Sequence, residues 1–288
     1  MSLRNRWAAF WHAPTSARNL AAARALLAGT ALWIVLSRVD LPGLLSFPPE
    51  VWAGVSPARN ARFFLGAPLL VERLLYGALH LALLAATFGV FPRVACFLGG
   101  LLLYHFAPFE TIIRSPNPYL RGFTIPTLGL LILSFTRGTD ALQWLPRRAA
   151  GTPPTLPGWP LRLIQVLFCQ IYFFAGYAKL VTSGLAWPTV ENVRRYLLGL
   201  NQGLATHPVS SLGYAVAELP WVCAFLGWAG LAFEFLFPLV LFSRMARLLL
   251  LPLALLFHAG NALLFRIFFP NIFLLLLFVD WDRPGSAS

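Results

Sequence analysis

Long apolar runs, separated by stretches rich in proline and arginine, make up most of this chain of 288 residues. A helix needs about 20 apolar residues to cross a bilayer, and fewer where it packs inside a bundle. The pattern therefore predicts an all-α, polytopic membrane helix bundle with about eight transmembrane helices, in a range of about seven to nine. The predicted helices span residues 20–37, 70–91, 93–109, 122–136, 160–180, 219–242, 247–265 and 269–281.

The connections between these runs differ in character, but none has the composition of a soluble linker. Residues 38–69 contain prolines throughout, which indicates a non-helical excursion, and residues 137–159 combine prolines with arginines. Residues 181–218 form the longest connection and include an amphipathic stretch at 190–198. Because the sequence also shows no internal repeat, we expect a single domain over residues 1–288.

The composition supports a membrane protein. Hydrophobic residues make up 58% of the chain and charged residues 11%, whereas soluble domains are about half apolar and a quarter charged. The net charge of +12 comes from arginines scattered between the apolar runs, so membrane lipid, not nucleic acid, is the expected partner. A small excess of arginines in alternate connections predicts a multi-pass protein of the bacterial inner membrane with a cytoplasmic N-terminus, and hence Lys179 on the outer side.

Several familiar kinds of site are not predicted. Cys96, Cys169 and Cys223 lie far apart inside apolar runs, which argues against a disulfide framework, a zinc site or a dithiol pair. The sequence shows no pair of metal ligands on one helical turn, no glycine-rich phosphate loop and no nucleophile elbow, so we expect no metal.

Lys179 is the only lysine among the 22 cationic residues, and it ends the apolar run of the fifth predicted helix. An amine in a low-dielectric site can lose its proton and act as a base, which a guanidinium cannot do. The alternative is a lysine that snorkels, with its stem in lipid and its head in water.

Polar and small residues form stripes on three predicted helices, and ionisable groups within a bilayer are costly enough to suggest function. On the fifth helix the spacing puts one face inward, made of Gln165, Cys169, Tyr172, Gly176 and Lys179. The sixth carries Cys223, Gly227, Gly230 and Glu234 on one face, and the seventh carries His258 and Asn261. The second and third offer Glu72, Tyr76, His80 and His105.

Each of these residues also has a structural interpretation. Glu234 paired with an arginine or with Lys179 would hold helices together. His80 and His105, taken alone, are more typical of interhelical hydrogen bonds than of a site. Most of the aromatic residues are expected at lipid contacts and at the membrane interface.

Residues 170–180 (Gln-Ile-Tyr-Phe-Phe-Ala-Gly-Tyr-Ala-Lys-Leu), followed by Trp187, resemble a helix-end motif of the vitamin K-dependent γ-carboxylase family. The resemblance is to the transmembrane part of these enzymes, the HTTM (horizontally transferred transmembrane) domain, and it extends over residues 15–281. Supporting stretches are 115–122 (Ser-Pro-Asn-Pro-Tyr-Leu-Arg-Gly), 234–238 (Glu-Phe-Leu-Phe-Pro), 258–261 (His-Ala-Gly-Asn) and 269–270 (Phe-Pro).

The resemblance implies a specific chemistry and a specific cofactor, a reduced quinone of the vitamin K hydroquinone or menaquinol type. In the carboxylases the lysine that matches Lys179 deprotonates the quinol. The quinol anion reacts with oxygen to give a strongly basic alkoxide, which removes a proton from a substrate glutamate before carbon dioxide adds. The quinone epoxide is the by-product.

The sequence departs from the carboxylases in two respects. The animal enzyme has a histidine in the context Asn-His-Ser-Tyr-Leu, where residues 116–120 here read Pro-Asn-Pro-Tyr-Leu, so Asn117 replaces the histidine. An asparagine forms hydrogen bonds but does not exchange protons at neutral pH. The large lumenal region that grips a protein substrate also has no counterpart in this sequence, so a small or lipid-like substrate is expected.

Three hypotheses follow. In the first, the protein is a quinol-dependent enzyme with Lys179 as base, tuned by Glu234 or His258, and with a long apolar cavity for an isoprenoid tail. Further residues would complete its site: Asn117, Tyr119 and Arg121 from the loop before the fourth helix, Tyr172, Gly176 and Asn261 around the quinol, and Trp187, Arg194 and Arg195 at the outer mouth.

The second hypothesis is a non-catalytic lipid-binding or assembly protein in which Lys179 and Glu234 form a closed, dry pair. The third is a small-molecule or proton carrier that uses Glu234 and His258 as a relay. We rank the carrier last because the sequence shows neither an inverted repeat nor paired broken helices.

Overall fold

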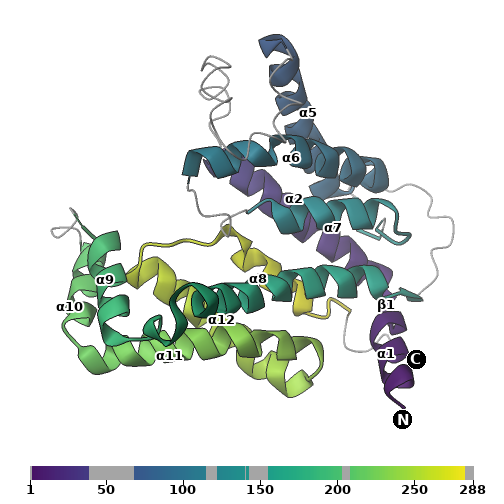
Figure 1. Ribbon diagram of the computed structural model, residues 1–288. Coiled ribbons are helices and arrows are strands. Elements are labelled where there is room, and N and C mark those ends of the chain that lie inside the picture. The colour runs from purple at the N-terminus through teal and green to yellow at the C-terminus, as the bar shows by residue number, and fades with distance from the viewer. Residues whose placement is uncertain are drawn as a thin grey trace. The chain divides into compact units, whose positions relative to one another are not determined.

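The computed structural model describes residues 2–38, 68–114, 122–139, 141–142, 155–202 and 208–282. In these residues the chain is almost entirely helical (Figure 1), which confirms the all-α prediction. One antiparallel pair of three-residue strands is the exception in the described part of the chain. The chain divides into two compact units, one made of Met1–Gln165 with Phe273–Ser288 and the other of Val166–Ile272.

The first unit is built around one helix with an alanine-rich face. Its elements are α1 (Leu3–His12), β1 (Pro14–Ser16), α2 (Ala17–Arg38), α5 (Leu69–Phe88), α6 (Pro92–Arg114), α7 (Thr124–Ser134), β2 (Thr155–Pro157) and the first residues of α8 (Trp159–Ser183). Ala21, Ala28 and Ala31 of α2 are buried, and small side chains let α5 and α7 pack closely on this helix. β1 pairs with β2 so that Thr15 lies opposite Leu156.

A buried arginine completes the end of α5. Arg24 of α2 donates hydrogen bonds to the carbonyl oxygens of Ala86, at 2.8 Å, and Leu142, at 2.5 Å. The last carbonyls of a helix have no partner within the helix, so a cation here satisfies one of them. Gly89 follows with a φ of 76°, the left-handed conformation that glycine adopts most readily at a helix C-cap.

The second unit holds the remaining helices and the longest connection. It contains the rest of α8, the 3-10 helix η4 (Gly184–Ala186), α9 (Val190–Leu200), α10 (Pro208–Ala217), α11 (Pro220–Leu236), the 3-10 helix η5 (Phe237–Leu241) and α12 (Arg244–Leu264). Val193 and Leu197 of α9 are buried with Ala217 and Cys223, so the amphipathic stretch predicted at 190–198 packs its apolar face against α10 and α11.

Five helices of the described residues are long and apolar enough to cross a membrane: Ala17–Ser37, Leu69–Phe88, Trp159–Ala186, Pro220–Leu241 and Arg244–Leu264. They correspond to the first, second, fifth, sixth and seventh predicted helices. The third prediction corresponds to α6, which extends to Arg114.

The remaining two predictions correspond to shorter elements. The fourth is the 11-residue α7, whose length of about 16 Å is less than a bilayer core. The eighth is not an α-helix but the nine-residue 3-10 helix η6 (Pro270–Phe278), which begins at a proline. α10, which lies in the predicted connection 181–218, is not predicted by the sequence pattern, because a ten-residue helix gives a weak periodic signal.

Candidate functional site

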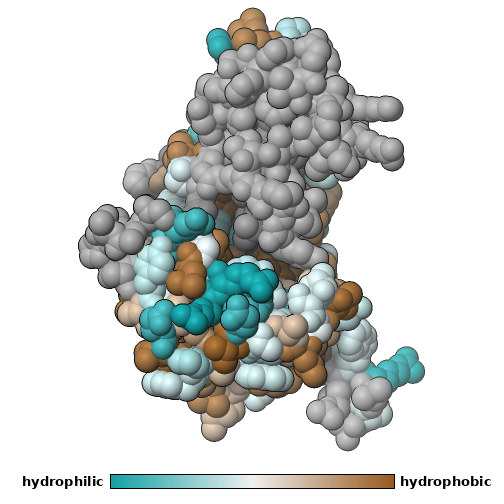
Figure 2. Space-filling model, turned by 60° about the vertical axis from the view of Figure 1, so that its left-hand side comes forward, coloured by the Kyte–Doolittle hydropathy of each residue, from teal (hydrophilic) through white to brown (hydrophobic). Residues whose placement is uncertain are grey.

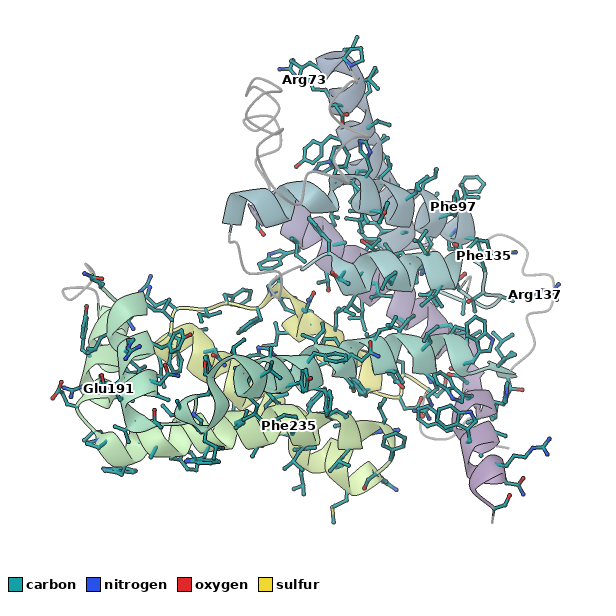
Figure 3. The ribbon with its side chains drawn as sticks, viewed as in Figure 1. Arg73, Phe97, Phe135, Arg137, Glu191 and Phe235 are labelled. Atoms are coloured by element: carbon teal, nitrogen blue, oxygen red, sulfur yellow. The ribbon has the colours of Figure 1, made fainter. Side chains whose placement is uncertain are left out.

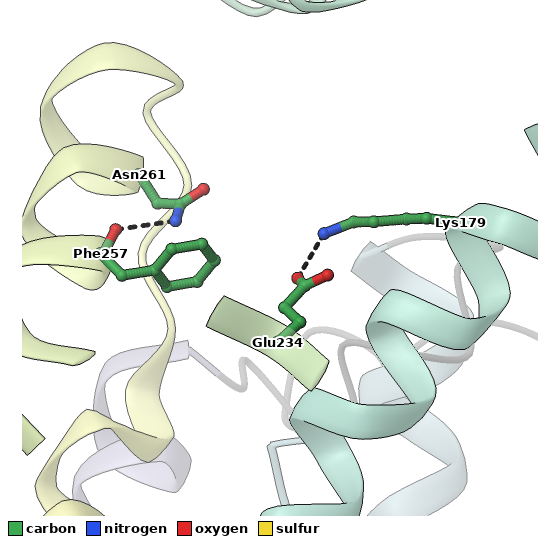
Figure 4. A network of polar contacts seen from close by, with 4 residues as sticks. All are labelled: Lys179, Glu234, Phe257 and Asn261. Carbon is green, nitrogen blue, oxygen red and sulfur yellow. Dashed lines mark hydrogen bonds and ion pairs between the residues drawn. The ribbon is translucent and has the colours of Figure 1, made fainter. Parts of the chain in front are cut away.

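An ion pair inside the second unit joins the two residues that the sequence singled out most strongly. Lys179, in the last turns of α8, donates a hydrogen bond through Nζ to Oε1 of Glu234 on α11 (Figure 4). The Glu234 side chain is only 5% exposed and that of Lys179 is 23% exposed. The pair therefore has one desolvated end, the carboxylate, and one end that solvent or a ligand can reach.

Gly176 makes the approach of these two helices possible. A Cβ atom at Gly176 would lie 3.2 Å from Cβ of Glu234 and 3.1 Å from the ring of Phe235, which Figure 3 labels on α11. Phe235 in turn packs edge to face on Phe173 of α8, with ring centroids 5.4 Å apart. The inward face predicted for α8 is thus in contact with α11 one turn before Lys179.

Trp187 covers the ammonium group. Its ring centroid lies 5.1 Å from Nζ of Lys179, a cation–π distance. The main chain at Trp187 is held from α9, because Nδ2 of Asn192 donates to its carbonyl oxygen at 2.9 Å. Pro188, the next residue, rests on Gly227 of α11, where a side chain would have no space.

A second polar pair lies two turns earlier on α8. The hydroxyl of Tyr172 and Nε2 of His258, on α12, are 2.7 Å apart, and both side chains are buried. Tyr172 and Lys179 are seven residues apart on one helix, which puts them on the same face and about 10 Å apart along the axis. The two pairs therefore follow one seam of the second unit.

Aromatic rings enclose the Tyr172–His258 pair. The ring centroids of Phe237 and Phe233 lie 4.1 Å and 5.6 Å from that of Tyr172, and Phe269 lies 5.3 Å from His258. Phe257 packs on Phe233, the residue before Glu234, with ring centroids 4.8 Å apart. The sequence predicts most aromatic residues at lipid contacts; the phenylalanines named here form the wall of the site instead.

Two buried polar atoms of the site have no hydrogen-bond partner among the described residues: Oε2 of Glu234 and Nδ1 of His258. An unsatisfied buried polar atom costs about 1–3 kcal/mol. Each pair thus keeps one buried polar atom whose hydrogen-bonding capacity no described residue uses.

Asn261 lies across from the ion pair. Its Nδ2 donates to the carbonyl oxygen of Phe257 one turn earlier, at 2.8 Å, and Figure 4 shows both residues on α12 facing the Lys179–Glu234 pair. This intrahelical bond uses one donor of the amide and leaves its oxygen for another partner.

Seven of the predicted site residues lie in the second unit on α8, α11, α12 and the connection between η4 and α9: Tyr172, Gly176, Lys179, Trp187, Glu234, His258 and Asn261. Two more, Arg194 and Arg195, lie in the same unit on α9. Asn117, Tyr119 and Arg121 lie outside the described residues. Arg194 and Arg195, predicted at the mouth of the site, both line a groove along α9, and Arg194 pairs with Glu218 at 3.0 Å. The long cavity for an isoprenoid tail stays a prediction.

The polar residues of the second and third predicted helices form a separate group in the first unit. Nε2 of His105 on α6 lies 3.1 Å from Oε2 of the buried Glu72 on α5, an interhelical contact of the kind expected for this histidine. His80 instead contacts the carbonyl oxygen of Tyr76 in its own helix, at 2.8 Å.

The apolar spans and the buried ionic seam define an integral membrane protein with a helical core. Its family follows from comparison: a family model described as the HTTM domain matches residues 65–282. That match covers most of the chain, so the protein belongs to the HTTM family. Neither the curated proteins nor the solved structures yielded a match.

Proposed function

We propose that this protein is a quinol-dependent membrane enzyme of the carboxylase or epoxidase type, in which Lys179 is the base. The observation that carries the proposal is the environment of the single lysine. Its amine contacts a buried carboxylate on one side and a tryptophan ring on the other, inside a member of the HTTM family.

Glu234 and Trp187 both stabilise the ammonium ion that Lys179 becomes when it accepts a proton. A neutral Lys179 amine that takes a proton from an acidic hydroxyl becomes an ammonium ion, and that ion gains the attraction of the Glu234 carboxylate. The Trp187 ring adds a cation–π contribution of about 0.5–2 kcal/mol. Glu234 thus tunes the base, and its unpaired Oε2 is a second acceptor beside it.

The side chains along the seam fit a ring with two hydroxyl groups and an apolar tail. Nδ1 of His258 and Oε2 of Glu234 have no hydrogen-bond partner among the described residues, the phenylalanine rings supply apolar contacts, and Asn261 offers an amide oxygen. A bound reduced quinone would supply an acidic hydroxyl and, with one molecule of oxygen, would give the quinone epoxide and water. Tyr172 and His258 would orient the ring, and Lys179 would receive the proton. Asn117, Tyr119 and Arg121 remain part of this proposal.

The decisive experiment is quinol oxidation by the full chain in nanodiscs. Menaquinol or vitamin K hydroquinone is supplied with oxygen and bicarbonate, and products are followed by mass spectrometry. Lys179→Arg keeps the positive charge but cannot act as a neutral base, so we expect at least about a hundredfold loss of epoxide formation. Glu234→Gln is expected to lose less epoxide formation than Lys179→Arg, because it weakens the base without removing it.

Arg73→Lys, at an exposed position of α5, is the matched control for exchanging one cation for another. Equal turnover by the parent and by Lys179→Arg would show that Lys179 is not the base. The substrate that accepts carbon dioxide is expected to be small or lipid-like. A multi-pass location in a bacterial inner membrane with a cytoplasmic N-terminus completes the proposal, and the arginine bias supports it.

One observation favours a second candidate, a non-catalytic lipid-binding or assembly protein. The ion pair itself joins α8 to α11 and leaves the Glu234 carboxylate almost fully buried, as a structural pair would. In that case no quinol is oxidised, Lys179→Arg is as abundant as the parent, and Lys179→Ala lowers abundance. The same nanodisc assay with an abundance measurement therefore separates the two candidates.

A further inference from the structure

A groove of about 550 Å³ runs along one face of α9 in the second unit. Its lining residues on and just after this helix are spaced as one helical stripe, and Tyr214 of α10 forms the facing side. The stripe consists of Glu191, Arg194, Arg195, Leu198, Gly199 and Gln202. The opposite face of α9 carries the buried Val193 and Leu197, so the groove lies on the face of α9 turned away from this core cluster.

The groove concentrates hydrogen-bond donors. Nη2 of Arg194 donates to Oε1 of Glu218 at 3.0 Å, an exposed ion pair beside the groove. Arg195 is exposed and has no ion pair with any described residue. The hydroxyl of Tyr214 donates to the carbonyl oxygen of Asn201 at 2.7 Å, which orients this side of the groove. Glu191 is the single carboxylate among the described lining residues, at the opposite end of the stripe from Gln202, and Figure 3 shows it on the outer side of α9.

The position of α9 in the chain places the groove near a membrane surface. α9 and α10 connect two candidate spans, one ending at Ala186 and the other beginning at Pro220. A connection of this kind emerges where the spans leave the bilayer, at the depth of the lipid head groups. Leu198 lies in the groove, and Leu200 and Leu212 are exposed on the same two helices. Figure 2 brings this end of the protein forward and shows hydrophilic side chains directly beside hydrophobic ones.

We propose that this groove binds a phosphate oxyanion carried by an amphiphile, the head group of a phospholipid, with Arg195 as the main contact and Arg194 and Gln202 beside it. The planar guanidinium matches two phosphate oxygens at once, and basic pockets beside membrane helices hold anionic head groups in this way. The apolar residues next to the groove suit the start of an acyl chain. This inference does not depend on quinol chemistry, because the Lys179–Glu234 ion pair and the Lys179–Trp187 cation–π contact involve none of the groove residues.

The test is lipid titration of the delipidated full chain, read by native mass spectrometry. Three ligands are compared: phosphatidylglycerol, diacylglycerol with the same acyl chains, and soluble glycerol 3-phosphate. We expect phosphatidylglycerol to bind at least about tenfold more tightly than diacylglycerol, since only the former has the oxyanion. Arg195→Gln should weaken phosphatidylglycerol binding by about tenfold, the usual scale for one charge-assisted contact.

Arg195→Lys keeps the charge but loses the planar guanidinium that can bind two phosphate oxygens. Its affinity for phosphatidylglycerol should lie between those of Arg195→Gln and the parent. Arg73→Gln removes an exposed arginine of α5, outside the groove, and should bind phosphatidylglycerol like the parent. Thermal melting and gel filtration of each variant verify that it is folded.

The proposal is overturned if diacylglycerol binds as tightly as phosphatidylglycerol, or if Arg195→Gln and Arg73→Gln have equal affinities. Displacement of the lipid by glycerol 3-phosphate at similar concentrations would overturn the lipid source and assign the site to a free phosphate ester. If displacement needs at least about a hundredfold more glycerol 3-phosphate, the acyl chains contribute to binding and the lipid is the ligand.

Discussion

A Cβ atom at Gly227 would lie only 2.6 Å from the carbonyl oxygen of Pro188. This close approach lets the connection after α8 rest directly on α11. The residue before Pro188 is Trp187, whose ring covers Lys179. Gly227 on α11 thus sets the position of the Trp187 ring over the Lys179 amine through Pro188.

Replacing Gly227 with alanine is expected to displace this connection. Contact with main-chain atoms cannot be relieved by a side-chain rotation, so we expect a loss of about 1–3 kcal/mol in stability. Quinol turnover should also fall, because Trp187 moves away from the ammonium. Thermal melting in detergent and the nanodisc assay measure the two effects.

Gly260 of α12 provides the control, since a Cβ atom there would have no neighbour within 4 Å among the described residues. Gly260→Ala should leave melting unchanged or raise it, because alanine is the better helix former. If Gly227→Ala and Gly260→Ala have the same melting temperature and the same quinol turnover, then Gly227 does not position Trp187.

Exchange of Trp187 tests the cation–π contact directly. Trp187→Leu removes the aromatic face and should lower turnover by about 2- to 30-fold, the equivalent of 0.5–2 kcal/mol. Trp187→Phe has a ring with a weaker cation–π interaction, so its turnover should lie between that of Trp187→Leu and that of the parent. An effect of the same size for both variants would point to lost packing volume instead, and steady-state turnover with melting as a folding check distinguishes the two.

Removal of one partner of the Lys179–Glu234 pair is expected to cost more than removal of both. Lys179→Met leaves a buried carboxylate without its cation, whereas the double variant Lys179→Met with Glu234→Leu leaves two apolar side chains. We expect the double variant to melt at a higher temperature than Lys179→Met alone. Additive losses in this double-mutant cycle would mean that the two side chains are energetically independent.

Tyr172→Phe should destabilise the second unit through its partner. The substitution keeps the ring but removes the hydroxyl, so the buried Nε2 of His258 loses its hydrogen bond at a cost of about 1–3 kcal/mol. In a His258→Leu background the same change should cost much less, because the partner is already gone. Chemical or thermal unfolding of the four proteins in the cycle tests this, and an unchanged cost would contradict the pairing.

Periodicity predicts the helices and the faces of this protein well. The spacing of Tyr172, Gly176 and Lys179 in the sequence identifies the inward face of α8, and the family resemblance draws attention to Trp187. Periodicity within one helix does not say which helix faces it, however. The bond between Tyr172 and His258 joins positions 86 residues apart, and nothing in either segment specifies the other.

Packing between irregular segments is equally hidden in the sequence. Gly227 is recognisable as a small residue that permits close contact, but its partner is a loop residue, Pro188, and not another helix. The phenylalanines around Tyr172 are also not predictable from the pattern. A helix face that meets lipid and one that meets the protein core are both apolar, so the sequence does not tell the two apart.

The single lysine gives this protein a built-in reporter. Apart from the N-terminal amine, Lys179 is the only amino group in the chain, and its side chain is 23% exposed beneath the Trp187 ring. Reductive methylation with a carbon-13 reagent would therefore label only this side chain and the N-terminus, without any mutation. The chemical shift of the Lys179 label would record the protonation of the amine directly, and the ring current of Trp187 would mark whether a ligand has moved the ring aside.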